Sequence, residues 1–309
     1  MALMRSMLLA ASQNTWLREH AVHYPFVRRT VSRFMPGETV EAALVAAQSL
    51  AQKNIGSVFT HLGENVADRD EARQVAEHYV SVIEQIRGLR MSTEVSVKLT
   101  QLGLDLSPEL CAGHLDTIIR AERSTSTVWV DMESSQYVDA TLALYQQALR
   151  KHPNVGICLQ AYLYRTKKDL EDLLPLCPSI RLVKGAYKEP ANVAFPEKTK
   201  VDENYFTLAQ QLLSLRAART CPRAAFGTHD IPLIGRLKAY GEQQGVPTCD
   251  LEIQMLYGIQ RAEQERLAKE GSRSVVLIAY GNYWYPWFVR RLAERPANLW
   301  FMLRNVFAS

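Results

Sequence analysis

Three basic side chains stand in short apolar runs, where a charge is costly to bury. Lys98 lies in EVSVKLT, and Arg181 and Lys184 lie in IRLVK. A buried cation without a partner is strongly unfavourable, so the set predicts an anionic ligand. The alternative is a group of structural ion pairs, such as Lys98 with Asp131, and it stays open for any single residue.

A second basic pair follows the last apolar run, within the string WYPWFVRRLAE. Glu294 lies four residues after Arg290 and three after Arg291, which places it beside both on one helix. Paired guanidinium groups suit a carboxylate or a phosphate. The neighbours of the pair are aromatic, which favours a partly buried setting over a solvated face.

Familiar catalytic signatures are absent from the sequence. It contains no P-loop, no G-x-G-x-x-G, no H-E-x-x-H and no G-x-S-x-G. The seven histidines lack metal-ligand spacing, so no metal is expected. His229, at the end of an apolar run, is the histidine with a candidate role.

Composition sets the class of protein. The 309 residues are 47% hydrophobic and 22% charged, which suits a large core and excludes disorder. The net charge of +4 is spread along the chain, so nucleic-acid binding is not expected. Five scattered cysteines without a C-x-x-C favour a reducing compartment over a disulfide framework.

The apolar stretch at the N-terminus is too short to cross a membrane, which takes about 20 apolar residues. It continues into a polar and aromatic helical pattern, so a cleaved signal peptide is not expected. We expect a cytoplasmic protein and leave open peripheral contact with the inner face of the cytoplasmic membrane.

Eight apolar runs, each followed by a helical pattern, provide the frame for these residues. Runs this short and rich in valine and isoleucine are typical of parallel strands buried on both faces. The expected strands are 55–60, 94–100, 127–132, 156–161, 180–184, 224–228, 251–256 and 274–280.

Helix signals separate the runs. Asp68 with Glu71 fits a capping box, as does Thr166 with Asp169, and Ser107 precedes a proline suited to a first turn. Further helices are expected at 136–151, 202–218, 231–244, 258–270 and 285–294.

This alternation predicts an α/β fold, a single (β/α)8 TIM-type barrel with extra N-terminal helices at about 2–34 and 39–53. An open doubly wound sheet is the alternative, but the glycine-rich turn of a Rossmann unit is missing. We expect residues 1–54 to form a helical segment packed on the barrel. Residues 55–309 form the catalytic barrel, within one functional domain overall.

Such a barrel keeps its active site at the C-terminal ends of the strands, so polar residues there are candidates. The charged connection 188–204, after the fifth strand, is a candidate lid over that face, and a solvated loop without function is the alternative. Besides the cations, the candidates are Thr100, Asp131, Glu133, Gln160, Tyr162, Tyr187, Thr228, His229, Asp230, Glu252, Gln254 and Tyr280.

Several strings together resemble the proline dehydrogenase family. They are VSVKLT, WVDMES, LQAYLYRT, RLVKGAY, GTHD, EIQMLYG and YPWFVRRLAERPAN, in the family's order across residues 55–298. The N-terminal region is similar to that of short monofunctional bacterial members. The resemblance implies a distorted (β/α)8 barrel that binds FAD and oxidises L-proline to 1-pyrroline-5-carboxylate, the first step of proline catabolism. It also implies a quinone as electron acceptor.

The resemblance implies a substrate site. Lys98, Arg290 and Arg291 are similar to the family's clamp for the substrate carboxylate, and Asp131 and Glu294 to the partners of these cations. The remaining residues of the implied site are Tyr280 and Leu256 as walls against the proline ring, Tyr187 as a lining residue, and Glu64 as a gate that pairs with an arginine.

A cofactor site is implied in the same way. Arg181 and Gln160 resemble the residues that bond the flavin ring. The family often has an aromatic residue where this chain has Lys188, and Asn where it has Asp230, which puts the adenosine contacts in doubt. The positions that match the surroundings of the rest of the FAD are Lys184, Gly185, Thr228 and His229.

Two other functions compete with this interpretation. A Schiff-base aldolase would keep a nucleophilic lysine at a strand end, as Lys98 or Lys184. Flavin absorbance, or a failure of borohydride to trap a substrate adduct, would exclude it. A non-catalytic anion-binding barrel would bind a ligand without turnover. Neither alternative explains the full order of matching strings.

Overall fold

The structure is a computed structural model that describes residues 31–89, 91–122, 126–219, 223–285 and 287–289. Within these residues, parallel strands pair in chain order and close into a barrel, with Gly56 opposite Val275 and His61 opposite Tyr280 at the closure. The predicted TIM-type barrel is confirmed. The strands are β1 (Gly56–His61), β2 (Thr93–Val97), β3 (Val128–Val130), β4 (Val155–Gln160), β5 (Ser179–Val183), β6 (Arg223–Gly227), β7 (Glu252–Leu256) and β8 (Arg273–Tyr280).

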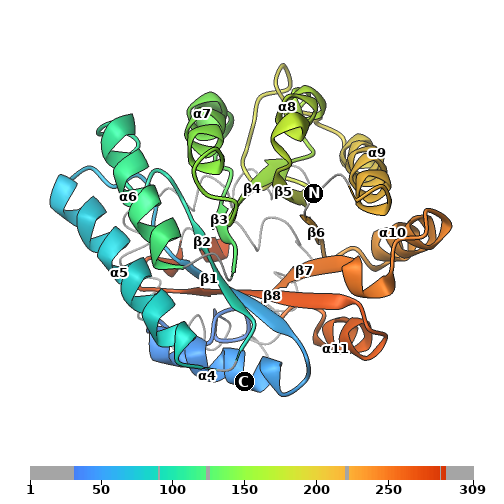
Figure 1. The fold of residues 1–309 in the computed structure, drawn as a ribbon, viewed down its shortest axis with the longest axis horizontal. Coiled ribbons are helices and arrows are strands. Elements are labelled where there is room, and N and C mark those ends of the chain that lie inside the picture. Colours follow the sequence, from blue (N-terminus) through green and yellow to red (C-terminus); the bar gives the residue numbers. More distant parts are fainter. Residues whose placement is uncertain (1–30, 90, 123–125, 220–222, 286, 290–309) are drawn as a thin grey trace, which may run out of the picture.

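Helices follow β1 to β7 and form a ring around the barrel (Figure 1). They are α5 (Arg69–Arg87), α6 (Pro108–Ala121), α7 (Val138–Leu149), α8 (Thr166–Leu173), α9 (Lys198–Ala217), α10 (Ile231–Gln243) and α11 (Arg261–Lys269). Short 3-10 turns lie at Ser135–Tyr137, Leu174–Leu176 and Thr248–Asp250.

One more helix, α4 (Val40–Ala51), precedes β1 and contacts β1 and β8. It corresponds to the predicted helix 39–53. Most of the predicted helix 2–34 lies outside the described residues, so the division of the chain at residue 54 stays a prediction.

Local capping chemistry explains where two of the helices begin. Asp68 accepts hydrogen bonds from the backbone N–H groups of Asp70 and Glu71 at the start of α5. Ser107 Oγ accepts from Leu110 N at 3.2 Å at the start of α6. Each side chain satisfies an N–H group that has no partner inside its helix, and both predicted starts are confirmed.

The predicted capping box at Thr166 is wrong. Thr166 is the first residue of α8, and its hydroxyl donates to the carbonyl oxygen of Gln160 at 2.5 Å. Asp169 instead accepts from Arg165, with Nε 2.8 Å from Oδ2. The threonine hydroxyl bonds to a carbonyl at the end of β4 in place of capping the helix, a competition that short polar side chains often enter.

Side chains alternate between two cores along each strand. The outer face packs against the helices and includes Phe59 and Ile278, whereas the barrel interior holds Val58, Trp129 and Val275. Adjacent residues of a strand point to opposite faces. This alternation decides which strand-end side chains reach the inside of the barrel and which point toward the helices.

The predicted lid is shorter than expected, because α9 already begins at Lys198. The remaining loop between β5 and α9 is joined by main-chain hydrogen bonds to the loop after β4. Phe195 N donates to Tyr162 O at 2.8 Å, and Tyr164 N donates to Val193 O at 3.1 Å. These bonds hold the two loops side by side.

Candidate active site

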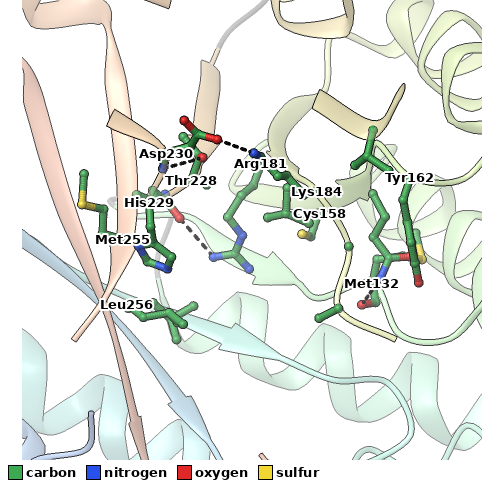
Figure 2. Close-up of a pocket in the computed structure, with 18 of the residues that line it drawn as sticks. Met132, Cys158, Tyr162, Arg181, Lys184, Thr228, His229, Asp230, Met255 and Leu256 are labelled. Atoms are coloured by element: carbon green, nitrogen blue, oxygen red, sulfur yellow. Dashed lines mark hydrogen bonds and ion pairs between the residues drawn. The ribbon is translucent and has the colours of Figure 1, made fainter. Parts of the chain in front are cut away.

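A cavity of about 870 Å³ opens at the C-terminal ends of the strands and takes lining residues from all of them or from the loops that follow. This size is in the range of sites that enclose a ligand or cofactor. The three strand-end cations, Lys98, Arg181 and Lys184, all line it. Figure 2 shows Arg181, Lys184 and Asp230 among the residues that line this cavity.

Arg181 forms the floor of the cavity. It is 2% exposed, and its Nη2 donates to Ser96 Oγ at 2.6 Å and to Asp131, while its Nη1 donates to Gln254 Oε1 at 3.3 Å. Its guanidinium carbon lies 5.0 Å from the ring centroid of Trp129. Burial opposes the charge, but the Asp131 carboxylate outweighs it and raises the pKa of Arg181. The floor therefore carries a fixed positive charge.

Lys98 approaches the same carboxylate. Its Nζ lies 3.9 Å from Asp131 Oδ2, while Oδ1 accepts from Arg181 and, at 3.0 Å, from Ser96 Oγ. A separation of 3.9 Å is an ion pair but is too long for a hydrogen bond. The ion pair named as an alternative is thus present, and Lys98 also lines the cavity.

Lys184 has closer partners. Its Nζ donates to Asp230 Oδ2 at 2.9 Å and to Asp202, which also pairs with Lys198. Burial opposes the negative charge of Asp230, but the hydrogen bond from Lys184 holds the pKa of that carboxyl below its usual value. Asp230 also accepts from Leu233 N at 3.3 Å and so caps α10. Lys184 is therefore not a bare cation but part of an ionic quartet, formed by Lys184, Lys198, Asp202 and Asp230.

Gln160, on β4, presents an unused acceptor. Its Nε2 donates to the Met132 carbonyl oxygen at 3.2 Å, while its Oε1 has no hydrogen-bond partner among the described residues. The residue is 3% exposed and lines the cavity. A buried polar atom without a partner is rare in native proteins and points to a ligand.

Gly185 follows β5 in a conformation that favours glycine, with φ +110°. A Cβ at this position would lie 2.2 Å from the ring of Tyr162. The main chain therefore borders the cavity where no side chain would fit.

Glu64 and Tyr187 come from the loops after β1 and β5, and both line the cavity. The Tyr187 hydroxyl donates to Glu64 Oε1 at 3.5 Å, which is the outer limit of a hydrogen bond. Glu64, the predicted gate residue, thus contacts the loop after β5 through Tyr187.

Tyr280 lies elsewhere, and the structure corrects its predicted place. The side chain is 1% exposed, stands on the outer face of β8, and has its hydroxyl 2.8 Å from His78 Nε2 on α5. Alternation along β8 turns Tyr280 outward and Leu277, three residues earlier, inward. Among the described residues, the apolar side chains of β7 and β8 that line the cavity include Leu256 and Leu277. The role of Leu256 as a wall against the proline ring stays a prediction.

Thr228 and His229 line the cavity at the end of β6, where both were predicted. Thr228 Oγ1 accepts from Asp230 N at 3.2 Å. Arg290, Arg291 and Glu294 lie outside the described residues, so their roles stay predictions.

A buried carboxyl group also lies at the end of β3. Glu133 is 3% exposed and accepts from Thr100 N at 3.1 Å and from Thr100 Oγ1 at 2.6 Å. Burial raises the pKa of Glu133 to about 7, against the opposing effects of these bonds and of Lys98. It is therefore a group that changes charge near neutral pH.

Sequence reasoning missed several lining residues, among them Leu277 and Asp202. The period-two pattern along 274–280 could have identified Leu277, because it shares a face with Val275. Nothing in the charged connection 188–204 distinguished Asp202 from its neighbours. In the part of the chain that the structure describes, no helix is long and apolar enough to cross a membrane, and no acidic, histidine or cysteine cluster could hold a metal.

Comparison with known proteins places this chain in a family. The proline dehydrogenase family model matches residues 43–304. Proline dehydrogenase 1 of Bacillus subtilis (strain 168) is 39% identical over 306 residues, which cover 98% of this chain and 99% of that protein. Proline dehydrogenase of Deinococcus radiodurans is 36% identical over 280 residues, 89% of each chain. The chain belongs to the proline dehydrogenase family, and its activity is the oxidation of proline.

Solved structures share the fold. Proline utilization A from Bdellovibrio bacteriovorus, inactivated by N-propargylglycine, superposes with a TM-score of 0.80 at 22% identity, covering 94% of this chain and 36% of that one. Proline utilization A from Corynebacterium freiburgense gives a TM-score of 0.71 at 21% identity, covering 98% of this chain and 34% of that one. At such identities the likeness establishes the barrel alone.

Proposed function

We propose that this protein is an FAD-dependent enzyme that oxidises L-proline to 1-pyrroline-5-carboxylate and passes the electrons to a quinone. The family is generally flavin-dependent. The observation that carries the proposal is that the same cavity is lined by the buried Arg181 guanidinium, on β5, and by a Gln160 side chain, on the neighbouring strand β4, whose oxygen has no partner among the described residues. A cation held in place and a hydrogen-bond acceptor shielded from water suit a planar ligand that carries both hydrogen-bond acceptors and an N–H group.

These residues fit FAD. Gln160 and Arg181 would hold the flavin ring, the first through its free amide oxygen and the second through its guanidinium. FAD, when bound, supplies the hydride acceptor of the oxidation. The fixed charge of Arg181 would stabilise negative charge that develops on the ring. The remainder of the cofactor would be held by Lys184, Gly185, Thr228 and His229.

The substrate would be held by its carboxylate, the only permanent anionic group of proline. Lys98, with Arg290 and Arg291, would bind it, and Asp131 and Glu294 would orient these cations. A clamp of this kind fixes the ring carbon beside the nitrogen in the reactive orientation.

Apolar and aromatic side chains would complete the substrate site. Leu256 and Leu277 would pack against the pyrrolidine ring. Tyr187 and Glu64 would close the mouth and exclude water from the reacting atoms. The proton of the substrate amine would pass to solvent water before the mouth closes.

The electrons would leave the protein to a membrane quinone, with the enzyme in the cytoplasm and bound peripherally to the inner face of the cytoplasmic membrane. The sequence has no nicotinamide fingerprint, which supports an acceptor other than NAD.

The absorption spectrum and acceptor range of the purified protein test this proposal. The protein should be yellow, and the cofactor released by heat should be FAD. Proline should bleach it without oxygen, and a soluble quinone analogue should restore the colour while NAD should not. A colourless protein that does not take up added FAD would refute the cofactor. Proline-dependent reduction of NAD would refute the acceptor.

A further inference from the structure

Gln254 joins two charged layers of the barrel. It lies on β7, is 4% exposed and lines the cavity. Its Oε1 accepts from Arg181 Nη1 at 3.3 Å, and its Nε2 donates to Glu252 Oε1 at 2.7 Å. A single amide therefore connects a cation on the cavity side with an anion on the N-terminal side of the barrel.

Glu252 belongs to a buried ionic cluster. Arg223 binds it with Nε 2.7 Å from Oε2 and Nη2 2.6 Å from Oε1, and also binds Glu94. Glu94 Oε2 accepts from Trp129 Nε1 at 2.9 Å. Glu94 and Glu252 are 5% and 2% exposed, so the loss of a partner from either carboxylate is costly.

The indole of Trp129 contacts both arginines. The guanidinium carbons of Arg181 and Arg223 lie 5.0 and 4.9 Å from its ring centroid, within the range of cation–π contacts. Trp129 is fully buried in the barrel interior. Hydrogen bonds and ring contacts thus run from Arg181 through Gln254, Glu252, Arg223 and Glu94 and back through the indole.

An amide is suited to this place because its two ends have opposite hydrogen-bonding character. The oxygen only accepts, as the Arg181 N–H requires, and the nitrogen only donates, as the Glu252 carboxylate requires. A carboxylate here would face Glu252 with like charge, and an apolar side chain would leave both neighbours short of a partner.

We propose that Gln254 is a positioning residue, which fixes the orientation in which Arg181 presents its charge to the cofactor. The inference rests on the proposed binding of FAD beside Arg181. Asp131 and Ser96 both hold Nη2, and Gln254 holds Nη1. The Cys158 side chain on the neighbouring strand also hydrogen-bonds to Arg181. Without Gln254, Nη1 loses its amide partner, so this end of the guanidinium is held less firmly and its charge can shift away from the ring.

The consequence is a change in the redox balance of the flavin. A cation held beside the ring stabilises the reduced, anionic flavin more than the oxidised one. Gln254→Leu should therefore shift the midpoint potential of the bound FAD to more negative values. A tenfold change in the two-electron equilibrium corresponds to about 30 mV, and a shift of about that size or larger is expected. The Michaelis constant for proline should stay near its wild-type value.

The experiment is a spectroscopic titration of the full-length, FAD-loaded protein against a reference dye. Gln254→Glu is a second variant, which sets a second carboxylate against that of Glu252. The repulsion between the two should displace the side chain from Arg181, so the potential should also fall. Ile253→Val is the matched control, because Ile253 is a buried neighbour on β7 that packs in the outer core. Its potential should equal that of the wild type.

A wild-type potential in flavin-containing Gln254→Leu, which removes the acceptor for Arg181, would overturn the positioning role. Loss of FAD from both variants, with Ile253→Val still loaded, would also count against it and assign Gln254 to binding or folding. A wild-type protein that takes up no FAD would instead refute the proposed function on which the inference rests.

Discussion

Replacement of Lys98 by methionine should weaken proline binding and leave the cofactor in place. Lys98 Nζ is 3.9 Å from Asp131 Oδ2, whose other oxygen is already engaged by Arg181. The lysine lines the cavity with a looser partner than Lys184 has. We therefore expect Lys98 to supply a donor to the substrate carboxylate, and methionine preserves the length of the side chain without its charge.

The magnitude follows from the kind of bond lost. A charge-assisted hydrogen bond in a site sheltered from water is worth roughly 1.5–3 kcal/mol, which is about ten- to a hundredfold in affinity. Lys98 is only 9% exposed, so water cannot easily replace the ammonium group. The Michaelis constant for proline should rise within that range, and carboxylate inhibitors should weaken by a similar factor.

Steady-state kinetics with a dye acceptor, combined with the flavin-to-protein absorbance ratio, provide the assay. Lys184→Met is the informative comparison, because Lys184 lies in the ionic quartet with Asp202 and Asp230. This variant should lose FAD and change the Michaelis constant for proline little. An unchanged Michaelis constant in a fully loaded Lys98→Met enzyme would show that the lysine serves only its ion pair with Asp131.

Three further outcomes are expected. Leu277→Ala should lower kcat/KM for proline by about tenfold or more through lost packing, and should narrow the preference for proline over 4-hydroxyproline. Tyr280→Phe should leave both quantities unchanged. If instead Tyr280→Phe changed them and Leu277→Ala did not, Tyr280 would be the wall. Arg290→Met and Arg291→Met should each raise the Michaelis constant for proline about ten- to a hundredfold with flavin retained, and normal values would place them at the surface. Because the folded pKa of Glu133 is about 7 against 4.5 in the unfolded chain, the folded state binds the extra proton, and stability should fall as pH rises through that window. Thermal melts of Glu133→Gln across the window should lose that part of the fall; an identical pH profile would contradict the raised pKa.

The fold could be predicted because its signal is repeated along the chain. Each buried parallel strand is short and almost wholly apolar, and the intervening helices bring their own caps at Asp68 and Ser107. The errors are local. Thr166 has the composition of a cap, but its hydroxyl found a carbonyl on β4, which only the folded chain brings within reach.

Strand positions alone were enough to predict that Arg181 and Gln160 would lie at the cavity. The prediction failed where the direction in which a single side chain points decides its place. Tyr280 and Leu277 differ by three positions, an odd number, so they stand on opposite faces of β8. The partner of a side chain can be far away in the sequence. Gln254 and Arg181 are 73 residues apart, and a single sequence does not show that such a pair is in contact.

The main-chain bonds that join the loop after β5 to the loop after β4 have an implication for divergence. Bonds such as Phe195 N to Tyr162 O do not depend on the side chains that the loops carry. The exposed positions of the loop, among them Lys188 and Asn192, can therefore drift among relatives or be randomised in a library while the rim of the cavity keeps its shape. New contacts with a redox partner could evolve there at little cost to folding.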